Sequence, residues 1–206
     1  MNTKKINKES LKEQVKNILY DKIISGEFQP NERLKIVPIA DALDVSQAPV
    51  REAIQCLITS GHLEHIPNVG VRVKEFTETE VKEIYKVREA LEIASLKELQ
   101  GSTETLAEDL ERYFDKMKTA CKNDRLEEYI KQNNLFHRCF VEASGNKKML
   151  EVWDSLHLPL YMKHTLVNLS LSIEEALPLH LPIIAALKKS STERAIHALE
   201  NHYSFV

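Results

Sequence analysis

The chain has 206 residues, 43% of them hydrophobic, and its 28 Lys and Arg stand against 31 Asp and Glu for a net charge of −3. This composition is typical of a soluble globular protein and excludes a disordered or collagen-like chain, and no apolar run approaches the roughly 20 residues that a bilayer span needs. Three scattered cysteines, few glycines and an N-terminus without a secretory signal indicate a mainly helical protein of the reducing cytoplasm, with no disulfide framework and no membrane partner.

The N-terminal part begins with a polar tail and a helix. Residues 1–9 are mostly polar and predict a flexible tail. A capping-box pattern from Ser10 to Glu13 then opens a helix, whose apolar residues recur at helical spacing until Gly26 ends it. Residues 29–32 predict a turn, because Pro and Asn there favour a reversal of the chain.

Two short helices and a hairpin follow. One helix is centred on residues 39–43 and the other begins after Ser46, with apolar residues where two crossing helices must touch. Alternating segments at 63–66 and 71–74 predict a β-hairpin. This order predicts a winged helix-turn-helix, an α+β DNA-binding domain, over residues 10–75.

The second helix of the pair carries the candidate DNA contacts. Ser46 suits an N-cap, and Pro49 suits the first turn, where its missing N–H has no intrahelical partner. A recognition helix enters the major groove with this end, where Gln pairs with adenine and Arg pairs with guanine or binds phosphate. The candidate contacts are Ser46, Gln47, Ala48 and Arg51 on the helix and Asn68, Gly70 and Arg72 on the hairpin. The alternative is that Arg51 lies on the solvated face of a purely structural helix.

A family pattern runs through this domain. It comprises Ile24-x-Gly26-x-Phe28-x-Pro30, Leu34, the run Val45-Ser46-Gln47-Ala48-Pro49-Val50-Arg51-Glu52-Ala53-Ile54, Gly61 and Asn68-x-Gly70. On these motifs the chain resembles the GntR family of bacterial transcription regulators, which implies binding to double-stranded DNA. It departs from the family pattern at Gln47, where Arg is frequent, at Asn31, where Gly is frequent, and at Ile36, which replaces a usual acidic residue. The departure at Gln47 bears on base preference.

From Thr77 onward the pattern is helical to the end of the chain. A second capping box, from Thr77 to Glu80, opens this part, and the domain boundary is expected between Lys74 and Thr77. The fold class expected is therefore mainly α: the winged helix-turn-helix is followed by an all-α antiparallel helical bundle over residues 76–206.

Three histidines interrupt helix faces that are otherwise apolar. His137 shares its stripe with Asn133, while His180 and His202 each interrupt another stripe. A buried imidazole needs a hydrogen bond or a ligand. Inside one bundle the three can converge on a divalent metal, although each can also be a hydrogen-bonded core histidine.

A second family pattern runs through the bundle. It comprises Arg88-x-x-Leu91-Glu92, Phe136-His137, Ser144-Gly145-Asn146, and His180-x-x-Ile183-Ile184-x-Ala186-Leu187 running on to His202. These residues resemble the FCD effector domain found in many GntR regulators. The resemblance implies a metal held by one Asp and three His, with a small carboxylate effector often completing the shell. His137, His180 and His202 match the histidines, but Asn133 stands where the family usually has Asp.

Asn133 leaves three outcomes open. The metal, of which Zn or Ni is expected, is held more weakly, or a carboxylate effector becomes a more necessary ligand, or no metal binds and the histidines hold an anion directly. Arg88 is a candidate effector residue, because its guanidinium can fork onto a carboxylate inside the bundle. The alternative for Arg88 is a surface pair with Glu92 at i, i+4 spacing.

We therefore expect a ligand-responsive transcription regulator and not an enzyme. It is expected to act as a homodimer on a palindromic operator, with residues 76–206 providing dimerisation and effector binding. One alternative is a sensor of the metal ion itself. Another is a metal-dependent hydrolase, since three His with an open position also make a hydrolytic zinc site, but no general base such as the Glu of His-Glu-x-x-His accompanies them.

Overall fold

The computed structural model describes residues 10–156, 158–168 and 172–204, so the tail predicted over residues 1–9 lies outside the described residues. The chain divides into two compact units, Met1–Glu75 and Phe76–Val206. Each unit has its own buried apolar residues, which is the mark of an independent core. The two units are therefore described separately.

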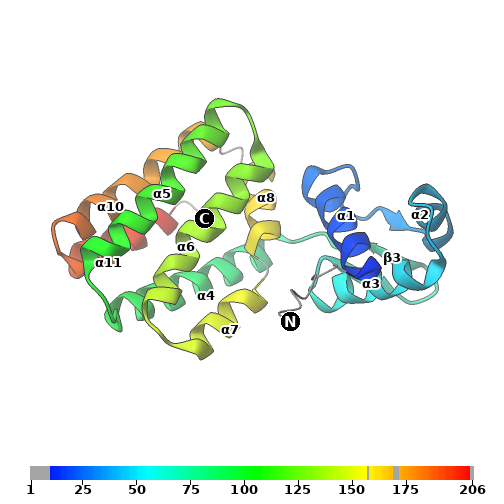
Figure 1. The fold of residues 1–206 in the computed structure, drawn as a ribbon, viewed down its shortest axis with the longest axis horizontal. Helices are drawn as coiled ribbons and strands as arrows, with labels where there is room; N and C mark the ends of the chain where they lie inside the picture. Colours follow the sequence, from blue (N-terminus) through cyan, green and yellow to red (C-terminus); the bar gives the residue numbers. More distant parts are fainter. Residues whose placement is uncertain (1–9, 157, 169–171, 205–206) are drawn as a thin grey trace, which may run out of the picture. The chain divides into compact units, whose positions relative to one another are not determined.

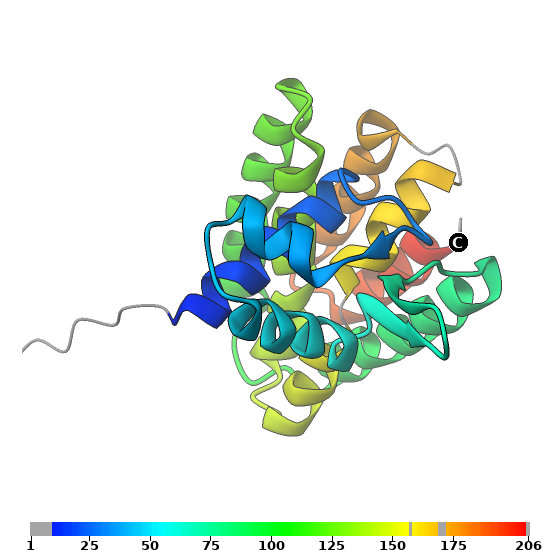
Figure 2. The same ribbon diagram turned by 90° about the vertical axis from the view of Figure 1, so that its right-hand side faces the viewer.

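The first unit contains three helices and three short strands. Its elements are α1 (Leu11–Ser25), β1 (Arg33–Leu34), α2 (Ile36–Ala42), α3 (Gln47–Thr59), β2 (Leu63–Ile66) and β3 (Gly70–Val73). The Ser10 hydroxyl accepts from the Glu13 N–H at the start of α1, and Gly26 ends that helix in the left-handed conformation with φ 80°. The predicted start and end of this helix are confirmed, but only the Ser10 half of the predicted capping box is present, because the Glu13 carboxylate pairs with Lys16. Figure 2 shows the three helices of this unit gathered beside its strands.

The core of this unit forms where α1 packs on α3. Val15 and Leu19 of α1 and Val50 and Leu57 of α3 are all almost completely buried. Asp44 makes the turn between α2 and α3 with φ 51°, a conformation that Asp tolerates better than most residues other than glycine. This turn sets α2 across α3 and leaves the amino end of α3 at the surface.

The sheet contains one strand more than predicted. Its order is β1-β3-β2 with antiparallel pairing throughout, and β2 with β3 is the predicted hairpin. The additional strand, β1, pairs Arg33 with Arg72 and Leu34 with Val71. A two-residue strand is too short to show alternation in the sequence, which is why the sequence predicted only the hairpin.

The second unit is entirely helical among its described residues. Its elements are α4 (Glu78–Lys97), α5 (Thr103–Lys122), α6 (Leu126–Ala143), α7 (Lys147–Ser155), α8 (Leu158–Asn168), α9 (Ile173–Ala176), the 3-10 turn η1 (Leu177–His180), α10 (Leu181–Lys188) and α11 (Thr192–Tyr203). The capping box from Thr77 to Glu80 is present at the start of α4. The predicted fold class, a winged helix-turn-helix followed by a helical bundle, is confirmed.

Five helices of the bundle form a closed ring (Figure 1). α6 packs between α4 and α5, α10 packs against α5 and α11, and α11 returns to pack against α4. The inward faces of these helices define the interior of the bundle, and the polar residues found there make up the site described below. Within the described ranges, no helix combines the length and the apolar character that crossing a membrane requires.

Candidate DNA-reading surface and buried polar chamber

The amino end of α3 is exposed, as a DNA-reading helix requires. Ser46, Gln47, Ala48 and Arg51 are all exposed. Ser46 occupies the N-cap with extended backbone, but its hydroxyl makes no capping bond to any described residue. One turn apart, Arg51 Nη2 donates to Gln47 Oε1 at 3.1 Å. The helix therefore presents a linked amide and guanidinium to its surroundings.

The three predicted contact residues on the hairpin have different surroundings. Asn68 is exposed with φ 63° and Gly70 has φ 110°, so both belong to a tight turn at the tip. Arg72 Nε donates to Glu64 Oε1 at 2.8 Å across the β2–β3 pair, and the ion pair offsets the charge of Arg72 within the sheet. Of the three predicted DNA contacts on the hairpin, Arg72 is thus the one that forms an ion pair within the protein.

Two cations beside α3, Arg33 and Lys35, were not predicted from the sequence as DNA contacts. A surface groove with a volume of about 620 Å³ is lined by Arg33, Lys35, Arg51, His65 and Gly70, among others. The Arg33 guanidinium lies against the Gly70 backbone, where a Cβ would approach Arg33 Nε to 3.3 Å. The sequence signal was present in the two cations that flank Leu34, but only the pairing of β1 with β3 places them beside the hairpin.

The three predicted histidines meet inside the bundle. His137 comes from α6, His180 from η1 and His202 from α11, and their exposed fractions are 0%, 1% and 6%. One ring nitrogen from each lies within 4.8 Å of the others. We call this group, with Asn133, Arg88, Glu92 and Tyr203 around it, the polar chamber.

Two of the three imidazoles have their Nδ1 atoms beside hydrogen-bond acceptors. His137 Nδ1 lies 2.8 Å from Glu92 Oε2, and His180 Nδ1 lies 3.1 Å from the Leu177 carbonyl oxygen. Since both partners accept hydrogen bonds, each Nδ1 carries the proton and each Nε2 presents a lone pair. These two Nε2 atoms are 3.3 Å apart, so their lone pairs lie close together and a cation bound to both would relieve the repulsion.

Asn133 lies on the same face of α6, one turn before His137, and is 3% exposed. Its Nδ2 is 2.8 Å from His180 Nε2, so the amide donates to the lone pair that a metal would otherwise use. A flip of the amide would present Oδ1 in its place, which is a neutral oxygen ligand. The residues present therefore fit a divalent metal with three nitrogen ligands and one weak oxygen ligand.

Arg88 points into the bundle and joins the chamber through Glu92. Arg88 Nε donates to Glu92 Oε1 at 3.0 Å, and the Tyr203 hydroxyl donates to the same oxygen. The i, i+4 pair of Arg88 with Glu92 thus forms as its spacing suggested, but at 2% and 0% exposure it is buried and not on the surface. Arg88 Nη2 is buried and has no hydrogen-bond partner among the described residues.

Burial sets the charge states in the chamber. It lowers the pKa of His180 to about 4 and holds the pKa values of His137 and His202 well below 6.5, so all three imidazoles are neutral at pH 7. It raises the pKa of the Glu92 carboxyl to about 7, while the Arg88 guanidinium acts in the opposite direction. Neutral imidazoles are the form that binds metal.

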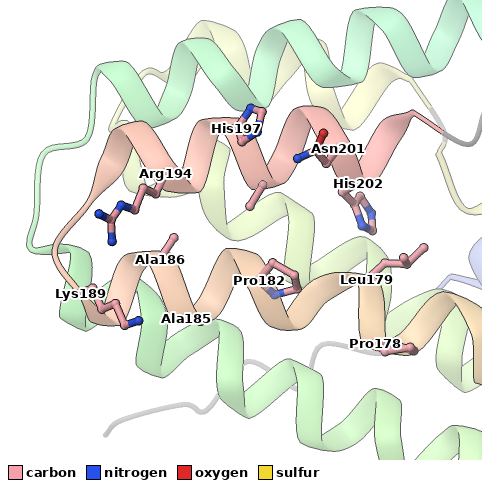
Figure 3. A pocket seen from close by; sticks show the side chains of 11 residues that line it. Pro178, Leu179, Pro182, Ala185, Ala186, Lys189, Arg194, His197, Asn201 and His202 are labelled. Atoms are coloured by element: carbon pink, nitrogen blue, oxygen red, sulfur yellow. The ribbon is translucent and has the colours of Figure 1, made fainter.

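A surface pocket leads to the third histidine. Its volume is about 470 Å³, and it runs along α10 and α11, as Figure 3 shows. His202 lies at one end of this pocket, and Lys189 and Arg194 lie at the other. The cations at its far end favour anionic ligands, and His202 belongs both to the wall of this pocket and to the chamber.

Glu92 and Tyr203 were not identified as parts of the site from the sequence. The sequence presents Glu92 as part of the FCD pattern and as a possible surface partner of Arg88, and Tyr203 has no periodic signal of its own beyond its place next to His202. Their roles depend on contacts between residues 45 and 111 positions apart, which no local pattern reports.

Sequence comparisons place both units in known families. Residues 11–73 match the bacterial regulatory proteins of the gntR family, and residues 83–205 match the FCD domain. Among curated proteins, the "Probable D-xylose utilization operon transcriptional repressor" of Paenarthrobacter nicotinovorans is 28% identical over 97% of this chain and 88% of its own length. The gluconate operon transcriptional repressor of Bacillus licheniformis is 27% identical over 90% of this chain and 79% of its own length.

Solved structures have the same fold. A GntR transcriptional regulator from Rhodococcus sp. RHA1 superposes with a TM-score of 0.78 at 26% identity, covering 95% of this chain and 94% of that one. The E. coli protein McbR/YncC gives a TM-score of 0.73 at 24% identity with the same coverage of both chains, a likeness that concerns the fold alone.

Proposed function

The chain belongs to the GntR family of bacterial transcriptional regulators, in the group with an FCD domain, and on that premise we propose that a small carboxylate effector in the polar chamber modulates its affinity for a palindromic operator. It is a DNA-binding transcription regulator, and two of its relatives are named as repressors of a D-xylose utilization operon and of a gluconate operon. We further propose that it acts as a homodimer in the cytoplasm, where two half-sites read together multiply discrimination.

The observation that carries the proposal is the buried Arg88 Nη2, which has no partner among the described residues, inside a chamber of neutral imidazoles. A buried guanidinium N–H without an acceptor is costly, and a carboxylate supplies the acceptor it lacks. An anion that binds one conformation of the bundle better than another shifts the population of conformations, and with it the affinity for DNA.

A divalent metal, Zn or Ni, is proposed as part of the effector site. His137, His180 and His202 would hold it through nitrogen, and Asn133 would hold it through its amide oxygen. The bound ion would offer open coordination positions to a carboxylate oxygen. Glu92 and the Leu177 carbonyl orient the rings of His137 and His180 for this purpose.

The test is a fluorescence anisotropy titration of duplex DNA from upstream of the protein's own gene. The protein should prefer this DNA to a random duplex, and sugar acids such as gluconate should change its affinity, while neutral sugars should not. Equal binding to both duplexes would count against an operator, and indifference to every carboxylate in a broad panel would count against the effector.

Operator affinity measured with the metal alone separates the proposal from a sensor of the metal ion itself. In the proposed mechanism, the metal without a carboxylate leaves operator affinity unchanged. A change in operator affinity produced by Zn²⁺ or Ni²⁺ alone would favour the metal-sensor alternative.

The hydrolase alternative gains no support from the site, because Glu92, the carboxylate next to His137, is held by three hydrogen bonds and is not free to act as a base.

A further inference from the structure

We propose that a divalent metal and a small carboxylate strengthen each other's binding in this chamber, and that Asn133 is the residue that makes the metal depend on the anion. The inference rests on the proposed function and specifies its effector site. It concerns a thermodynamic coupling between two ligands, and its basis is the balance of charge inside the bundle.

The chamber supplies no negative charge to a metal ion. The three histidines are neutral imidazoles, and Asn133 contributes a neutral amide where a carboxylate would have supplied an anion. Arg88 adds a positive charge of its own. An unpaired divalent cation in such a buried site is strongly unfavourable.

Glu92 cannot provide the missing charge. It is the one buried carboxylate within the described residues, and its charge already balances that of Arg88. Both of its oxygens are engaged, Oε1 by Arg88 and Tyr203 and Oε2 by His137 Nδ1. If Glu92 were protonated, the chamber would be still more positive, so the conclusion holds for either state of this group.

The anion therefore comes from outside, and Arg88 gives it a second anchor. Arg88 Nη2 is buried without an acceptor among the described residues. The guanidinium is packed near the rings of Tyr85, Trp153 and Tyr203, at 5.4–5.5 Å from their centroids, so it has little freedom to turn away. Glu92 bridges Arg88 to His137, which places the guanidinium beside the histidine cluster.

A carboxylate has the two functions that this geometry requires. One oxygen can accept from Arg88 Nη2, and the other can complete the shell of the metal and neutralise part of its charge. Without the metal, the carboxylate would be repelled by the lone pairs of the histidine nitrogens. Without the carboxylate, the metal would lack a counter-charge. Each ligand therefore removes a cost that the other would otherwise meet. Positive coupling follows, and it must be reciprocal.

The experiment measures Zn²⁺ binding by isothermal titration calorimetry to the full chain stripped of metal, with and without excess acetate as the simplest carboxylate probe. We expect acetate to strengthen Zn²⁺ binding by a factor in the range of about 5 to 150, the usual size of such couplings. Zn²⁺ should strengthen acetate binding by the same factor, because the coupling is reciprocal. Chelation of Zn²⁺ by acetate in solution would instead weaken the apparent binding of Zn²⁺ to the protein. Gluconate provides a second anionic probe and sorbitol an uncharged one.

Asn133→Asp is the decisive variant, because it adds the missing charge without changing the size of the side chain. It should bind Zn²⁺ more tightly in the absence of acetate and lose most of the coupling. Asn134→Asp is the matched control, since it adds the same charge at the neighbouring position of α6, outside the chamber, and should behave as the unmodified chain. Circular dichroism confirms that both variants are folded.

The inference is overturned if the unmodified chain binds Zn²⁺ equally well with and without the carboxylates, or if Asn133→Asp keeps the full coupling. Its failure is distinct from failure of the proposed function. Loss of coupling with operator binding still responsive to carboxylates would reject only the inference. Intact coupling with no preference for DNA from its own upstream region would reject the regulator model instead.

Discussion

Gln47 shows how a departure from the family pattern can keep the chemistry of the reading helix. Its Oε1 accepts a hydrogen bond from Arg51 Nη2, so the guanidinium is held in place before DNA arrives. A fixed guanidinium loses less freedom on pairing with guanine or phosphate. We therefore expect the Gln47 amide to support DNA binding by ordering Arg51, in addition to any contact of its own with a base.

Arg51→Ala should weaken binding to the operator by about 1–3 kcal/mol, because it removes the one cation among the predicted contacts on α3. Gln47→Ala should have a smaller effect, since Arg51 remains but is less ordered. Anisotropy titrations against the operator and a random duplex measure both. Unchanged operator affinity in Arg51→Ala would remove α3 from the DNA interface.

Two buried tyrosines predict opposite effects of the same substitution. The Tyr203 hydroxyl donates to Glu92, so Tyr203→Phe removes one of the three hydrogen bonds to that buried carboxylate and should lower the free energy of unfolding by about 1–3 kcal/mol. The Tyr129 hydroxyl is buried without a partner among the described residues, so Tyr129→Phe should be neutral or stabilising. Urea denaturation compares the two, and equal destabilisation would contradict the hydrogen-bond assignment.

At the scale of elements, local sequence signals predicted the ends of the helices well, but they did not predict contacts between residues that lie far apart in the sequence. Ser10, Gly26 and the Thr77 capping box mark helix ends through contacts within a few residues, and all three are present. The strand β1 has no such signal, because its two residues become a strand only by pairing with β3. Helical periodicity likewise placed the three histidines inward, but it could not show that Glu92 orients His137.

The position of β1 predicts a second set of DNA contacts. Arg33 and Lys35 line the groove next to Arg51, and the charge of Arg72 on the hairpin is offset by Glu64. Arg33→Ala and Lys35→Ala should weaken binding to operator and random duplex by the same factor, because phosphate contacts carry no sequence information. Each should lower the slope of log affinity against log salt by about 1.

Lys148→Ala controls for the loss of one positive charge, since Lys148 is an exposed lysine of the other unit. It should leave the salt dependence unchanged. If Arg33→Ala or Lys35→Ala affected only the operator, the groove would read bases and not phosphates. If neither affected any DNA, the groove would lie outside the interface.

At the scale of the whole molecule, the division into two units with separate cores predicts separable activities. A fragment of residues 10–75 should fold and bind duplex DNA, but it should read one half-site at a time. In the proposed homodimer the second half-site is bound at a high effective concentration, so the full chain should bind a palindromic operator at least about a hundredfold more tightly than the fragment. Sedimentation should give a monomer for the fragment and a dimer for the full chain and for residues 76–206.

The control for this comparison is an operator with one half-site scrambled. It should reduce the affinity of the full chain far more than that of the fragment, because only the full chain depends on the second half-site. A fragment that sediments as a dimer, or a full chain indifferent to the second half-site, would place dimerisation elsewhere than in the bundle. An effector in the chamber would then have to act within a single protomer, by changing how one α3 is presented, and not by altering the spacing of two.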